Sequence, residues 1–249
     1  MPPPDEKPKA PSAPLSLAGR YEVRLLGGLM LVGASVWVFM EIAGRVAEGS
    51  IRAFDEKVLL SMREPGDHSD PLGPEWVEEM CRDLTSLGSG GILILITLAA
   101  AAYLALLRKT RIMLFLFAAV FGGMIISLLL KDLFARPRPD LISKEALPLT
   151  LSFPSGHSMS AAVVYLTLGA LLARVQPNFR LKAYLLSLAL LITIVVGLTR
   201  VYLGVHWPTD VLAGWTAGAG WALICWTIAL LLQKQGTVER VASEKPPAS

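Results

Sequence analysis

The sequence predicts an all-α fold, a six-transmembrane-helix bundle, from its composition and from the recurrence of long apolar runs. The chain has 249 residues, of which 53% are hydrophobic and only 17% are charged, whereas a soluble domain usually carries about 25% charged residues. A bilayer core of roughly 30 Å needs about 20 apolar residues in a helix. Runs this continuous predict helices, because only helices and closed barrels satisfy their backbone polar groups in lipid.

Six apolar segments predict the spans in order along the chain. They are Leu25–Gly44, Leu84–Leu107, Ile112–Leu130, Ser158–Ala173, Ala183–Thr199 and Val211–Gln233. The fourth and fifth segments are short, so we expect flanking residues to extend both helices. The connection Arg108–Arg111 is so brief that the second and third spans must form an antiparallel hairpin.

The two ends of the chain are predicted to be disordered tails, residues 1–20 and 236–249, around one six-span domain, residues 21–235. The N-terminal tail is rich in Pro, Ala and Lys and lacks an apolar core, so it does not resemble a signal peptide. Cys81 precedes a span and Cys225 lies inside one, so we predict neither a disulfide framework nor a metal site. No nucleic-acid-binding motif is evident.

Lysine and arginine concentrate in the N-terminal tail, the second and fourth loops, and the C-terminal tail, which share one face of a six-span topology. The positive-inside rule therefore predicts that this face and both termini are cytoplasmic. The loops Arg45–Asp83, Lys131–His157 and Arg200–Asp210 then face outward. In the first of them, Ile51–Met62 and Pro74–Leu87 have helical spacing, and these stretches either lie in the interface plane or cover the bundle.

Residues suited to anion binding and proton transfer gather where the other two outer loops meet the spans. They are Lys131 and Arg138 after span three, Ser155, Gly156 and His157 at the start of span four, and Arg200, His206 and Asp210 between spans five and six. Taken alone, each cluster has a simple structural explanation, such as a lysine that snorkels from a helix end or an arginine in a solvated loop. All three clusters fall on the same predicted membrane face, which favours a shared active site at the outer membrane–water interface.

A phosphate group matches these side chains. Arginine supplies planar bidentate donors and lysine a compact point charge, so Lys131, Arg138 and Arg200 are predicted to bind phosphate oxygens. Ser155 can donate its hydroxyl, and Gly156 lets backbone N–H groups approach closely. Both stand at a helix N-terminus, which favours an anion.

The two histidines of these clusters are predicted to hold opposite protonation states. Neutral His206 attacks phosphorus while Asp210 accepts the proton on its other ring nitrogen. Protonated His157 donates to the departing oxygen and then activates water for the second step. This division of labour is nucleophilic catalysis with a general acid–base partner, and it predicts a bell-shaped pH dependence.

The spacing Lys-x6-Arg-Pro, then Pro-Ser-Gly-His, then Arg-x5-His-x3-Asp resembles the three-part signature of the type 2 phosphatidic acid phosphatase superfamily, in its integral membrane branch. The resemblance implies the same residue roles, a lipid phosphate or diphosphate substrate, and no metal ion or other cofactor. The family usually has Ser where this chain has Thr199, and Thr keeps the hydroxyl. For a bacterial source, the resemblance suggests undecaprenyl diphosphate, phosphatidylglycerophosphate or phosphatidic acid.

The expected function is therefore a metal-independent lipid phosphatase that acts through a phosphohistidine in a bacterial inner membrane, with its active site facing the periplasm. Its partners are the lipid substrate and membrane lipids, without nucleic acid, and the oligomeric state stays open. One alternative is a phosphotransferase that moves phosphate to another head group, such as lipid A. The other is a non-enzymatic lipid-phosphate-binding protein, against which the presence of both histidines and Asp210 argues. The third histidine, His68, is predicted to be a solvated loop residue.

Overall fold

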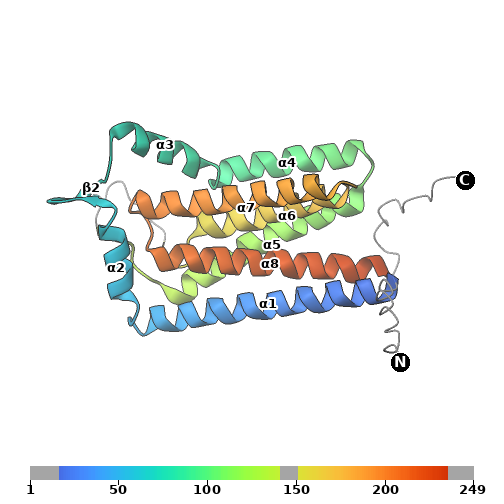
Figure 1. Cartoon of the computed structure of the whole chain (residues 1–249), viewed down its shortest axis with the longest axis horizontal. Coiled ribbons are helices and arrows are strands. Elements are labelled where there is room, and N and C mark those ends of the chain that lie inside the picture. Colours follow the sequence, from blue (N-terminus) through green and yellow to red (C-terminus); the bar gives the residue numbers. More distant parts are fainter. Residues whose placement is uncertain (1–16, 141–150, 235–249) are drawn as a thin grey trace, which may run out of the picture.

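The computed structural model describes residues 17–140 and 151–234, which form a helical bundle with a small hairpin at one end (Figure 1). The helices are α1 Leu17–Ala47, α2 Arg52–Leu60, α3 Glu75–Ser86, α4 Gly90–Leu106, α5 Thr110–Phe134, α6 Gly156–Arg174, α7 Phe179–Tyr202 and α8 Pro208–Lys234. The antiparallel strands β1 Arg63–Glu64 and β2 Asp67–Pro71 were not predicted. Helix α1 begins four residues before the predicted domain boundary, and the rest of the two predicted tails lies outside the described residues.

The predicted bundle is confirmed, with one span divided. Helices α1, α5, α6, α7 and α8 are each long and apolar enough to cross a membrane, and α3 with α4 forms a sixth candidate bent by 45°. The prediction of one continuous helix over Leu84–Leu107 is wrong, because α3 ends at Ser86 and α4 begins at Gly90. Glycine and serine in this junction have low helix propensity, which accounts for the break. Helices α6 and α7 extend beyond the predicted runs, as expected.

Helix α6 is the centre of the bundle. It packs against α4, α5, α7 and α8, and 56% of its apolar window is buried, compared with 11% for α1, which packs mainly on α8. Gly218 of α8 faces α6 so closely that a Cβ atom there would lie 2.5 Å from the carbonyl oxygen of Met159. Small residues thus let the two helices that carry the predicted catalytic residues approach each other, as expected for packing in a membrane.

The two described ends of the chain lie at the same end of the bundle. Figure 1 shows α1 beginning and α8 ending there, while α2, β2 and α3 gather at the opposite end. An even number of crossings gives this arrangement, in agreement with the predicted topology. Which end faces the cytoplasm stays a prediction.

The first outer loop covers the end of the bundle where α7 stops and α8 starts. Leu59 of α2 is 1% exposed and packs against Val201 and Val211. Arg63 donates to the carbonyl oxygen of Tyr202 at 2.8 Å, where a cation is favoured at the C-terminus of α7. The sequence left open whether this loop lies in the membrane interface or covers the bundle. Helix α2 covers the bundle.

Candidate active site

All eight predicted site residues lie at the end of the bundle that the first outer loop covers. Lys131 is in the last turn of α5, His157 in the first turn of α6, and Arg200 in the last turn of α7. His206 precedes α8, and Asp210 lies in its first turn. His157 is within electrostatic range of Lys131, Arg138, Arg200 and His206. The structure thus brings these residues from separate loops together, as predicted. Their chemical roles stay predictions.

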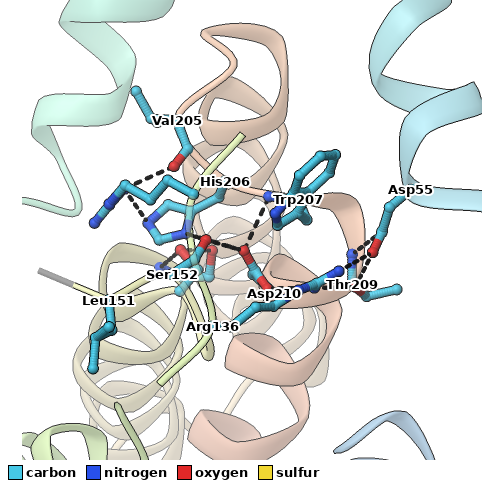
Figure 2. Close-up of polar contacts among 12 residues, drawn as sticks. Asp55, Arg136, Leu151, Ser152, Val205, His206, Trp207, Thr209 and Asp210 are labelled. Carbon is cyan, nitrogen blue, oxygen red and sulfur yellow. Dashed lines mark hydrogen bonds and ion pairs between the residues drawn. The ribbon is translucent and has the colours of Figure 1, made fainter. Parts of the chain in front are cut away.

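His206 is 1% exposed, and its two ring nitrogens have different surroundings (Figure 2). Nη1 of Arg138, a donor, lies 3.2 Å from Nε2. On the other side, Nδ1 lies 3.5 Å from Oδ2 of Asp210 and 3.4 Å from Oγ of Ser152. Because a guanidinium can only donate, Nε2 is the acceptor nitrogen and Nδ1 carries the proton. This is the tautomer that a histidine nucleophile attacking through Nε2 requires.

Asp210 is fully buried, and each of its carboxylate oxygens has partners (Figure 2). Oδ1 accepts from Nη1 of Arg136 at 2.7 Å. Oδ2 accepts from the hydroxyl of Ser152 and from the backbone N–H of Trp207 at 3.0 Å. The last bond closes the first turn of α8, in which Pro208 takes the first helical position. The residue that faces His206 is therefore held by the helix terminus itself.

Lys131 and the start of α6 form the second part of the site. The ammonium of Lys131 donates to the carbonyl oxygen of Leu151 at 2.9 Å. A Cβ atom at Gly156 would lie 3.4 Å from Cε of Lys131, so glycine leaves room for the lysine beside the helix N-terminus. Ser155 is the N-cap, and its hydroxyl oxygen accepts from both the N–H and the hydroxyl of Ser158. Ser155 thus organises the turn, and its predicted donation to phosphate stays a prediction.

Two guanidinium groups, the half-buried Arg138 and the buried Arg200, supply positive charge near His206. Arg138 donates to the carbonyl oxygen of Val205 at 2.7 Å, and burial lowers the pKa of this guanidinium from its usual value. Arg200 is 7% exposed and donates to Oγ1 of Thr85 at 3.2 Å, while its Nε has no partner among the described residues. A buried donor without an acceptor is unfavourable, so Arg200 is suited to receive an anionic oxygen.

Sequence reasoning missed five residues that support these groups. Asp55, Thr85, Arg136, Ser152 and Thr209 bind either Asp210, Arg200 or each other. Asp55 carried a usable signal, because it stands four residues before Leu59 and thus on the apolar face of α2. The others are short polar residues or a loop arginine, and nothing in the local sequence distinguishes them.

The pH dependence of the site follows from the burial of His206. Burial lowers the pKa of His206 from 6.5 to about 4, nearby Arg138 and Arg200 lower it further, and Asp210 opposes them. We expect the acid limb of kcat/KM that reports His206 to lie near pH 4. Between 6.5 and about 4 the unfolded chain binds more protons than the folded one, so stability should fall as the pH falls through this window. A kcat/KM profile and thermal unfolding in the same buffers check both, and an acid limb near 6.5 would contradict the assignment.

The junction between α3 and α4 lies close to His157, which predicts the effect of Gly88→Ala. A Cβ atom at Gly88 would lie 2.4 Å from Cγ1 of Val196 and 3.3 Å from Cβ of His157. Overpacking of this kind costs about 1–3 kcal/mol, so the unfolding midpoint in detergent and the turnover should both drop. Gly91→Ala is the control, because a Cβ there meets nothing within 4 Å. Equal unfolding midpoints for the two variants would contradict this prediction, because they would show that the junction accommodates the added methyl group without strain.

The long apolar helices of the bundle are those of a multi-pass integral membrane protein. Residues 111–234 match the PAP2 superfamily. Phosphatidylglycerophosphatase B of Bacillus subtilis is 33% identical over 72% of this chain and 85% of that protein. Decaprenylphosphoryl-5-phosphoribose phosphatase of Mycobacterium tuberculosis is 35% identical over 52% of this chain and 66% of that protein.

A solved structure agrees over nearly the whole bundle. The transmembrane PAP2 type phosphatidylglycerolphosphate phosphatase from Bacillus subtilis matches with a TM-score of 0.68 at 27% identity, over 85% of this chain and 98% of that chain. The chain therefore belongs to the PAP2 superfamily, whose membrane relatives here are lipid phosphatases. This confirms the resemblance inferred from the three motifs.

Proposed function

We propose that this protein hydrolyses a lipid phosphate or diphosphate through a phosphohistidine formed at His206. The observation that carries the proposal is the setting of His206, whose acceptor Nε2 faces a cationic cluster while Nδ1 is turned toward Asp210. Phosphatase activity on lipids agrees with the names of the relatives.

In the first step, Lys131, Arg138 and Arg200 bind the phosphate oxygens and offset the charge of the transferring group. Arg138 turns from Nε2 toward the phosphate, which exposes the lone pair of His206. Nε2 then bonds to phosphorus as the bond to the leaving oxygen breaks. The positive charge that develops on the ring is stabilised by Asp210, which is held by Arg136, Ser152 and the start of α8.

In the second step, His157 completes the cycle. It gives its proton to the leaving oxygen in the first transfer and so becomes able to accept one from water. The activated water attacks phosphorus, the bond to Nε2 breaks, and inorganic phosphate leaves. The reaction needs no other group for proton transfer, and we propose that it proceeds without a metal ion.

We further propose that both termini are cytoplasmic and that the site faces the periplasm of a bacterial inner membrane. The distribution of Lys and Arg supports this orientation, and the described ends of the chain lie opposite the site. A substrate in the outer leaflet would then present its head group at the level of His206, between the helix ends and the first outer loop.

The experiment that tests the proposal follows phosphate release by purified protein in detergent. The substrates are phosphatidylglycerophosphate, undecaprenyl diphosphate and phosphatidic acid, each with and without EDTA. Release that persists in EDTA supports metal-independent hydrolysis, and the ranking identifies the preferred lipid. Transfer of labelled phosphate to an acceptor lipid, with no free phosphate, would show a transferase instead.

A further inference from the structure

We propose that Asp55, in helix α2 of the first outer loop, is a positioning residue of the active site that acts on His206 through Arg136 and Asp210. The inference rests on the proposed function, because it concerns the same nucleophile. It assigns a role to a loop that none of the three sequence motifs includes.

Asp55 is 0% exposed, and every described polar group that it contacts is a donor (Figure 2). Oδ1 accepts from the backbone N–H of Thr209 at 2.9 Å. Oδ2 accepts from Oγ1 of Thr209 at 2.6 Å and from Nη2 of Arg136 at 2.7 Å. Three donors and no acceptor identify an ionised carboxylate, and a buried ionised group of this kind is retained only with full pairing.

Arg136 bridges two buried carboxylates. Nη2 binds Asp55 while Nη1 binds both Thr209 and Oδ1 of Asp210. The guanidinium is also stacked over the ring of Trp207, 5.5 Å from its centroid. The guanidinium is a rigid planar fork, so its bond to Asp55 through Nη2 is one of the contacts that orient Nη1 toward Asp210. Asp55 therefore fixes the position from which Arg136 holds Asp210.

Charge gives Asp55 a second effect. The ionised Asp55, Arg136 and Asp210 together leave one net negative charge beside His206. Three other groups lie near the ring, namely Arg138, Arg200 and His157. Each of them is positive or neutral, so none supplies negative charge. Removing the charge of Asp55 makes the cluster neutral, so the positive charge that develops on His206 during phosphoryl transfer loses support.

The test compares Asp55→Asn with the wild type in two measurements. Turnover should fall about 10- to 100-fold, by analogy with the loss on removing a residue that orients a metal-ligating histidine. The titration midpoint of His206 should move to lower pH by about half a unit or more. It is read by NMR of protein labelled with ¹⁵N-histidine, in which three histidines are assigned by single substitutions.

The matched control is Glu56→Gln, which removes the same charge one residue along α2. Glu56 pairs with Arg52 on the solvent side of the helix, so turnover and the His206 midpoint should stay as in the wild type. If Asp55→Asn behaves like Glu56→Gln in both measurements, the inference is overturned. If both variants lower turnover and shift the midpoint equally, the effect is one of general charge and the inference also fails.

A second comparison guards against misfolding of Asp55→Asn. Asp55→Asn/Arg136→Gln removes both charges of this ion pair. It is compared with Arg136→Gln alone, because both variants leave Asp210 without its arginine partner. The double variant should again titrate His206 at lower pH than its single parent, whereas equal midpoints would contradict a role for the Asp55 charge. Neither midpoint requires turnover. A wild type that releases no phosphate would therefore refute the proposed function while the titration still tests Asp55.

Discussion

Replacing His206 with alanine is expected to abolish phosphate release, with kcat/KM falling by about 10⁴-fold or more. The substitution removes Nε2, the nitrogen that would bond to phosphorus, while the cations that bind phosphate remain. Substrate binding should therefore persist in the variant, and only turnover should be lost. Phosphate release and binding of a labelled lipid phosphate, measured on the same preparation, separate the two effects.

The matched control for this prediction is His68→Ala. His68 is exposed in β2 and belongs to none of the motifs, so its removal should leave activity and binding at the wild-type level. If His206→Ala retains more than about one per cent of the wild-type rate, another group is the nucleophile or water attacks directly. That result would remove the basis of the proposed mechanism.

Replacing His157 with glutamine is expected to have the second largest effect, and its size should depend on the leaving group. A lipid alkoxide needs a proton to depart, so kcat/KM for phosphatidic acid should fall about 10²- to 10⁴-fold. An aryl phosphate has a good leaving group, so its first transfer should be little affected. The second step still needs a base, and the variant should show a burst of the aryl alcohol followed by slow turnover.

Rapid-mixing measurements on both substrates check this prediction. In the wild type, release of the aryl alcohol should be proportional to enzyme concentration and should show no slow phase after the first turnover. A loss of the same size on the lipid and the aryl phosphate, with no burst, would mean that His157 does not act as the general acid. His157 would then serve to bind phosphate, beside Lys131 at the start of α6.

The convergence of the candidate site residues could be predicted from the sequence, because these residues stand at helix ends. In a bundle, alternate loops return to the same end, so Lys131 after α5, His157 at the start of α6, and Arg200 and His206 after α7 had to meet there. The lengths of the apolar runs identified the spans, because a helix needs about 20 apolar residues to cross a bilayer. The junction at Gly88 was missed, because the apolar residues Leu87 and Ile92 flank a short break. The hairpin of β1 and β2 was missed as well.

The partners of the supporting residues were not predictable, because they depend on how the first outer loop docks. Asp55 is paired with Thr209 and Arg136, which lie far along the chain, and no repeated spacing joins them. Thr85 reaches Arg200 only because α3 packs on α7. Long-range pairings of this kind arise from the packing of helices, and helical periodicity in one segment carries no information about them.

The most direct test of the proposed chemistry is to trap the covalent intermediate. Protein and a ³²P-labelled aryl phosphate are mixed, quenched in alkali and digested, with His157→Gln included because its second step is slow. Phosphohistidine chemistry predicts an alkali-stable, acid-labile label on the peptide that contains His206, and its loss in His206→Ala. Full turnover with no labelled peptide, or a label on another residue, would contradict the assignment of His206 as the nucleophile.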